Sequence, residues 1–150
     1  MTGEALARAI AAELVREGFP RVPAQILLQL MVEPTGTATA AGLADSLGLS
    51  PAAVSGGIKY LDVLGFIRID TVPGSRRHAY SLPAVPWYSS TLMQDRYGPL
   101  RALIDAGLAD VEAGPARERL SEMSDFFRFL QGEMPRLWER WRASRPADEA

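Results

Sequence analysis

A predicted helix that begins at Pro51 has one face made of small and hydrogen-bonding side chains. At 100° per residue, Val54, Ile58 and Leu61 lie within about 40° of one another and must pack inward. The opposite face lets a helix lie deep in the major groove of DNA, where polar groups reach base edges and phosphates. The DNA contacts predicted from this helix and its cap are Ser50, Ala52, Ser55, Gly56, Lys59 and Tyr60. The alternative is a plain surface helix with a good N-cap.

Two adjacent arginines, Arg76 and Arg77, follow a predicted turn at Pro73-Gly74-Ser75. Guanidinium groups at a hairpin tip bind phosphates or enter the minor groove. His78 is expected to be a strand residue or a phosphate contact rather than a metal ligand, and Arg21 is a further phosphate-contact candidate. The alternative is a solvated hairpin whose charges discourage edge-to-edge pairing. Two arginines beside one turn favour the nucleic-acid contact.

The residue types that most enzyme chemistry needs are scarce. The chain has no cysteine, which excludes disulfides, thiolate metal sites and thiol redox switches, and it has a single histidine. Carboxylates in the C-terminal third alternate with arginines, as on a solvated helical face. They are Asp105, Asp110, Glu118, Glu122 and Asp125. No catalytic residue, metal or cofactor is therefore predicted, and an enzyme is the least favoured class.

The net charge of −2 conceals a basic middle segment. Residues 50–82 carry four basic and two acidic side chains, whereas acidic residues are in excess before and after them. Phosphate binding needs such a local field rather than a basic protein overall. The most apolar run, Ile26 to Val32, is far shorter than the roughly 20 residues that span a bilayer. We therefore expect a cytoplasmic protein that does not contact a membrane.

Glycine, proline and capping residues bound four predicted helices and two strands before residue 83. The helices are expected at 3–17, 23–32, 40–47 and 51–64, and the strands at 66–72 and 78–82. Thr39 and Ser50 are the expected N-caps of the third and fourth helices. Gly57 departs from the usual pattern, because a larger apolar residue is more common there. A helix-turn-helix followed at once by a basic-tipped hairpin predicts a winged helix.

Two further helices are predicted after Pro86. The first is one long helix, 88–111, with a kink or interruption at Pro99, and the last follows Gly114-Pro115 and should kink at Pro135. Apolar residues in the last helix recur at alternating spacings of three and four, which is a heptad seam. The seam consists of Leu120, Met123, Phe127, Leu130, Met134, Leu137 and Trp141. One chain of this size is too small to cover it, so we predict a homodimer.

Four stretches together resemble the GbsR-like branch of the MarR family. They are GFPRVPAQILLQLMVEP, AAGLADSLGLSPAAVSGGIKYLDVLGFI, GSRRHAY and FLQGEMPRLWERW, and the resemblance runs from about Leu14 to Arg142. The Asp-x-Arg wing pattern of the wider family is absent, because Gly74-Ser75-Arg76 stands there. The resemblance implies a homodimeric regulator in which the first helix and the last two form a dimerisation layer beneath two DNA-reading lobes. It also implies a small effector between the two regions.

The fold expected from these elements is mostly α with a small β wing. Residues 1–150 form one domain, with the winged helix-turn-helix lobe at 21–82 and the helical dimerisation region at 1–18 and 87–144. Aromatic residues near the junction are effector candidates, because such rings cage quaternary ammonium groups. They are Trp87, Tyr88 and Tyr97, with Trp138 and Trp141 in the last helix. The alternative is that these rings fill the core and the dimer interface.

The leading functional hypothesis is a sequence-specific regulator that represses transcription by covering a palindromic operator in double-stranded DNA. The alternative is a winged-helix protein-interaction module, for which Lys59, Arg76 and Arg77 would be incidental and DNA binding would show no sequence preference.

Overall fold

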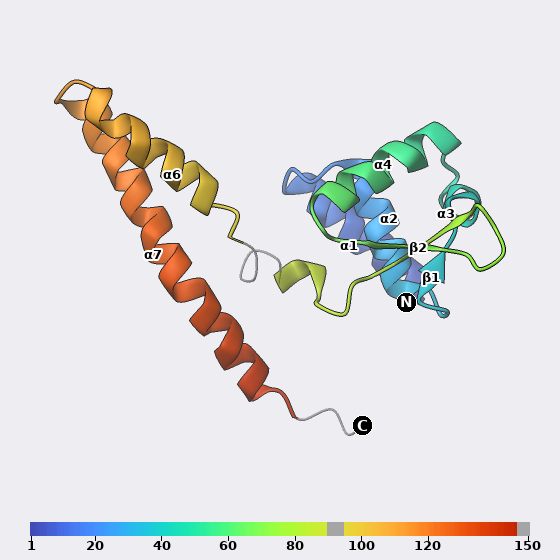
Figure 1. The fold of residues 1–150 in the computed structure, drawn as a ribbon. Coiled ribbons are helices and arrows are strands. Elements are labelled where there is room, and N and C mark those ends of the chain that lie inside the picture. Colours follow the sequence, from blue (N-terminus) through green and yellow to red (C-terminus); the bar gives the residue numbers. More distant parts are fainter. Residues whose placement is uncertain (90–94, 147–150) are drawn as a thin grey trace. The chain divides into compact units, whose positions relative to one another are not determined.

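The structure, a computed structural model, describes residues 1–89 and 95–146 and divides the chain into two compact units. Unit 1 is Met1–Trp87 and unit 2 is Tyr88–Ala150 (Figure 1). Among the described residues, no helix is both long enough and apolar enough to cross a membrane.

Unit 1 is a helical body with a small antiparallel sheet. Its elements in chain order are α1 (Gly3–Arg16), α2 (Arg21–Val32), β1 (Thr37–Ala38), α3 (Ala40–Leu47), α4 (Pro51–Val63), β2 (Arg68–Thr71) and β3 (His78–Ser81). The strands are ordered β1-β3-β2, with Thr37 opposite Ser81 and Ile69 opposite Tyr80. α1 packs on α2, and α4 packs on both α2 and α3. This is the predicted winged helix, and the mostly helical fold class is confirmed.

Local chemistry explains where α3 and α4 begin. The hydroxyl of Thr39 accepts the Gly42 N–H at 3.1 Å, and the hydroxyl of Ser50 accepts the Ala53 N–H at 3.1 Å. Both bonds satisfy backbone donors that lack a partner inside the helix. Pro51 occupies the first turn, where its missing N–H costs nothing. Both predicted N-caps are therefore confirmed.

The core of unit 1 forms where α2, α3 and α4 meet. Its fully buried side chains include Ile26, Leu27, Leu43, Val54 and Leu61. Because α2 contributes more buried residues than any other helix of the unit, it is the central helix, as its continuous apolar run predicts.

Gly57 lies at the closest approach of α4 to α2. A Cβ atom there would lie 2.7 Å from Ile26 Cδ1 and 2.9 Å from Val22 Cγ1. This close approach explains why glycine stands here in place of the larger apolar residue that is more usual at this position. In this chain the Ile26 side chain from α2 fills the space that such a residue would take.

The first wing strand is shorter than predicted at its N-terminal end. The prediction was 66–72, whereas β2 is Arg68–Thr71. The Phe66 N–H donates to the Leu61 carbonyl at 2.9 Å, so Phe66 completes the end of α4 instead of pairing in the sheet. β3, His78–Ser81, lies within the predicted 78–82.

Unit 2 consists of α6 (Gly98–Gly107), the short 3-10 helix η2 (Leu108–Asp110) and the 30-residue α7 (Pro115–Ser144). α6 packs along α7. Inside this pairing the Ser124 hydroxyl donates to the Asp105 carboxylate, which also faces Arg101 Nη1 at 3.5 Å. The predicted last helix is confirmed and continues through Pro135. The kink at Pro135 stays a prediction.

The prediction of one long helix over 88–111 is wrong in the part that the structure describes. Residues 87–89 form a short 3-10 helix, and α6 begins only at Gly98; residues 90–94 lie outside the described residues. Asp95 Oδ1 accepts the Gly98 N–H at 2.8 Å. Pro99 therefore lies in the first turn of a helix, where proline is tolerated, instead of inside one.

Candidate nucleic-acid interface

The outer face of α4 is built as the sequence predicts. Every residue of the predicted contact set on this helix is exposed or half-exposed, while Val54, Ile58 and Leu61 are buried. At Gly56 a Cβ atom would meet nothing within 4 Å. The exposed positions Ser50, Ala52, Ser55, Gly56, Lys59 and Tyr60 thus form one continuous surface of small and polar groups.

A tight turn sets the geometry between α3 and α4. Gly48 adopts the left-handed conformation, with φ +63°, and the Leu49 N–H donates to the Ala44 carbonyl at 3.0 Å. Only glycine takes this conformation at little cost. The turn therefore joins the two helices directly and leaves the start of α4 exposed.

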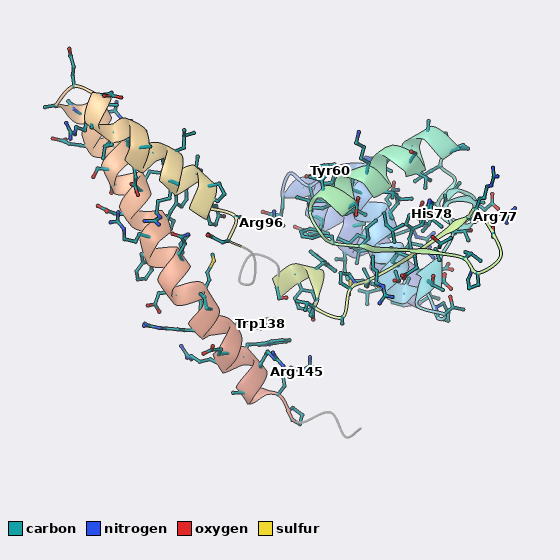
Figure 2. The ribbon with its side chains drawn as sticks, viewed as in Figure 1. Tyr60, Arg77, His78, Arg96, Trp138 and Arg145 are labelled. Carbon is teal, nitrogen blue, oxygen red and sulfur yellow. The ribbon has the colours of Figure 1, made fainter. Side chains whose placement is uncertain are left out.

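The wing carries two exposed arginines at its tip, followed by an exposed histidine. Arg76, Arg77 and His78 are all exposed, and Figure 2 marks Arg77 and His78 on the wing. The loop is ordered locally, because the Val72 N–H donates to the Arg77 carbonyl at 2.9 Å and the Ser75 hydroxyl accepts the Arg77 N–H at 3.0 Å. Neither arginine forms an ion pair within residues 1–89 and 95–146.

The wing holds a third arginine, which the site prediction did not include. Arg68 Nε lies 2.9 Å from Asp70 Oδ2 on the same strand. The Asp70 carboxylate offsets the charge of Arg68 in this pair, whereas Arg76 and Arg77 form no ion pair among the described residues. The positive field of the wing is therefore concentrated at its tip.

The predicted dimerisation seam is only partly covered within unit 2. Leu120, Phe127, Leu130 and Met134 are half-buried, whereas Met123, Leu137 and Trp141 are exposed. The buried side chains of α7 are Ser124 and Trp138, which lie outside the predicted seam. Exposed rings also occur beside it at Phe126 and Phe129.

The aromatic effector candidates have partners of their own. The Trp87 ring lies 5.6 Å from the Phe66 ring, and its Nε1 faces Met31 Sδ at 3.2 Å. Trp87 belongs to unit 1 and Tyr97 to unit 2, where the Tyr97 ring stacks on Phe127 at 4.8 Å. Tyr88 is exposed.

In α7, Trp138 stacks on Trp141 at 5.1 Å, and the Arg145 guanidinium lies 5.1 Å from the centre of the Trp141 ring. The chain's own cation thus lies over the Trp141 ring of this pair. Figure 2 labels Arg145 and Trp138 near the end of α7.

A pocket of about 480 Å³ opens in unit 1 among α1, α2 and α3. Alanine side chains of α1 form much of its wall, and Arg8, Arg21 and Gln25 supply polar groups. Gln25 Oε1 is buried without a hydrogen-bond partner, and neither Arg8 nor Arg21 forms an ion pair in the part of the chain that the structure describes. No aromatic effector candidate lines this pocket, and of its lining residues only Arg21 was singled out from the sequence, as a phosphate-contact candidate.

The described residues contain no group of three or more histidine, cysteine, aspartate or glutamate side chains that could hold a metal ion.

Comparisons with known proteins cover both units. A family model described as "MarR family" matches residues 17–78, and one described as "MmpR5-like MarR family transcriptional regulator" matches residues 86–144. No curated protein sequence matches the chain.

Among solved structures, one described as a transcriptional regulator is similar over 89% of this chain and 92% of its own, with a TM-score of 0.75 and 22% identity. Tm0710, a transcriptional regulator from Thermotoga maritima, is similar over 89% of this chain and 89% of its own, with a TM-score of 0.45 and 18% identity. ZitR from Lactococcus lactis is similar over 89% of this chain and 98% of its own, with a TM-score of 0.42 and 18% identity.

The first structural likeness supports the winged-helix fold, and the two family models place a MarR pattern in each unit. They indicate a regulator rather than an enzyme. With the exposed face of α4 and the cationic wing tip, they identify the chain as a DNA-binding transcriptional regulator of the MarR family.

Proposed function

We propose that this regulator is a repressor that binds a palindromic operator as a homodimer. α4 enters the major groove and the wing tip neutralises the flanking phosphates. The observation that carries the proposal is the exposed, small-residue face of α4 beside two arginines without an ion pair among the described residues. The small side chains near the start of that face, Ala52, Ser55 and Gly56, let the helix approach the base edges closely.

The proposal of a dimer is supported by the packing of unit 2. Its two main helices bury one large apolar side chain, Trp138, among the described residues, which is too little to stabilise an isolated pair of helices. A second copy offers the same seam and covers it by two-fold symmetry. Residues 1–18 and 87–144 then serve as the dimerisation region, with α1 also packed on α2.

A small effector is also part of the proposal. Three sites are candidates: the junction residues Trp87, Tyr88 and Tyr97, the aromatic pair in α7, and the pocket of unit 1. The pocket favours an anionic ligand, because the guanidinium groups that line it, Arg8, Arg16 and Arg21, outnumber its one carboxylate, Glu4. Calorimetry with hexanoate and with hexyltrimethylammonium separates the possibilities. Binding of hexanoate that Arg21→Gln weakens supports the pocket, whereas binding of the ammonium compound alone supports an aromatic cage.

The GbsR-like branch and a cytoplasmic location complete the proposal. Both rest on the sequence: the first on the four stretches that resemble that branch, the second on the absence of a long apolar run.

Selection from a pool of random DNA duplexes tests the central claim. We expect enriched sequences to share an inverted repeat whose half-site centres lie about 10 base pairs apart, the spacing of successive major grooves on one face. Recovery of duplexes without any common sequence would overturn the proposal and favour the protein-interaction module.

A further inference from the structure

Two helices of unit 1 end in the same way and place a phenylalanine at the same position. After α1, Gly18 is left-handed, its N–H donates to the Val15 carbonyl at 3.1 Å, and the Phe19 N–H donates to the Leu14 carbonyl at 2.8 Å. This pair of bonds is a Schellman motif, which fixes the residue after the glycine. Phe19 is therefore held by the backbone of α1.

The end of α4 repeats this arrangement. Gly65 is left-handed, its N–H donates to the Asp62 carbonyl at 2.9 Å, and the Phe66 N–H donates to the Leu61 carbonyl at 2.9 Å. The two motifs bring Phe19 and Phe66 together, with ring centres 6.3 Å apart and planes inclined by 4°. Two separate Gly-Phe sequences thus build one stacked pair of rings.

Two more rings extend this pair in opposite directions. Tyr60 on α4 meets Phe19 edge to face, with ring centres 5.7 Å apart and planes at 90°. On the other side Trp87, the last residue of unit 1, lies 5.6 Å from Phe66. All three separations fall within the range of favourable aromatic contact. We call Tyr60, Phe19, Phe66 and Trp87 the aromatic row.

The row joins a DNA-facing side chain to the point in the sequence where unit 2 begins. Tyr60 is 39% exposed, and its hydroxyl has no hydrogen-bond partner within the described residues, so it is available to DNA (Figure 2). Trp87 is fixed to α2 through its contact with Met31 Sδ. Its side chain therefore lies among core elements of unit 1, while the next residue belongs to unit 2.

We propose that Phe19 is a positioning residue for Tyr60, and that the aromatic row couples the orientation of the Tyr60 ring to the position of the Trp87 side chain. The inference rests on the proposed function in taking Tyr60 as a DNA contact. An edge-to-face contact holds the tyrosine ring in one orientation. A displacement of Trp87 then moves Phe66 and Phe19, and with them the ring that meets the DNA. The row gives unit 1 a route by which a change at its C-terminal end alters operator affinity.

Nuclear magnetic resonance tests the coupling without DNA. Tyr60 ring signals are assigned by comparison with Tyr60→Phe. Phe19→Leu keeps an apolar side chain but removes the ring, so we expect the Tyr60 ring signals to shift towards those of a free tyrosine. Trp87→Leu should shift them in the same direction and less. Phe129→Leu, a change at an exposed ring of α7, is the matched control and should leave them unmoved.

Operator titration then tests the consequence for binding. Phe19→Leu should lower affinity about two- to tenfold, the range expected for one aromatic pair. In the Tyr60→Ala background the same change should not lower affinity further, because the ring that Phe19 positions is absent. Thermal unfolding of each variant separates this effect from a loss of the fold, which would reduce affinity in both backgrounds alike.

Unmoved Tyr60 signals in Phe19→Leu, or equal losses of affinity in both backgrounds, would overturn the positioning role. A response to Phe19→Leu without one to Trp87→Leu would overturn the link to residue 87. If the wild-type protein selects no DNA sequence, the proposed function fails, whereas the resonance experiment still decides whether the row is coupled.

Discussion

The side chain of Ile26 on α2 lies against the backbone of Gly57 on α4, so closely that a Cβ atom at Gly57 would come within 2.7 Å of it. We expect Gly57→Ala to force the two helices apart and to lower the free energy of unfolding by about 1–3 kcal/mol, the usual cost of overpacking. Thermal or chemical denaturation measures the loss.

The neighbouring glycine supplies the matched control. Gly56→Ala adds the same methyl group to the same helix, but nothing lies within 4 Å of its Cβ atom. It should raise stability by up to about 1 kcal/mol, because alanine is the better helix former. Equal stability of the two variants would contradict the close approach of α4 to α2.

Gly56 also offers a test of DNA reading. Gly56→Glu places a long acidic side chain on the exposed face of α4, where it collides with base edges and repels phosphates. Specific operator binding should be abolished while the unfolding temperature stays near that of wild type. A folded Gly56→Glu protein that binds the operator normally would mean that another surface reads the DNA. Gly56→Ala adds only a small side chain and should retain most of the binding.

The arginines of the wing tip should make DNA affinity depend on salt concentration. Arg76 and Arg77 form no ion pair among the described residues, so both can displace counterions from phosphates. On B-DNA each phosphate contact contributes about 0.9 to the slope of log K against log salt, so Arg76→Ala with Arg77→Ala should flatten the slope by about 3 to 4 units for a dimer. Titration at several salt concentrations measures the slope.

Arg68 is the control for the wing, because it lies on the same hairpin but is paired with Asp70. Arg68→Ala should change the slope by less than half of what either tip arginine contributes. A larger effect from Arg68 than from the tip would move the DNA contact from the loop to the strand.

The helix ends of unit 1 were predictable because they depend on neighbours in sequence. Thr39, Ser50 and Gly48 act on backbone groups a few residues away, so their types alone locate the ends of α3 and α4. The outward face of α4 follows from helical periodicity in the same way. These local rules also underlie the predicted DNA-contact set on that helix.

Three other features of the structure were not predictable from those rules. Phe66 has a strong strand preference, yet the left-handed Gly65 before it holds it at the end of α4. A proline such as Pro99 can lie at a kink inside a helix or in the first turn of one. The hydrogen bond from the Gly98 N–H to Asp95 Oδ1 accompanies the start of α6, so Pro99 lies in the first turn. The packing of Tyr60 on Phe19 joins residues far apart in the chain, and no pattern in either segment indicates it.

The last prediction concerns assembly. Leu130 lies in the middle of the heptad seam of α7 and is only half-buried within its own chain. Burying each large apolar side chain contributes roughly 1.5–3 kcal/mol, so several at an interface hold a dimer at working concentrations. Leu130→Glu puts a charge into that interface and should give a monomer in light scattering.

Loss of the dimer should weaken operator binding by far more than any direct contact of Leu130 could explain, because two α4 helices about 34 Å apart bind one operator only when they are joined. Glu139→Lys is the control: residue 139 lies on the opposite face of α7 at 100° per residue and is exposed, so this variant should stay dimeric. A monomeric wild-type protein, or a monomeric Leu130→Glu variant with undiminished affinity for the full site, would contradict the role of the seam.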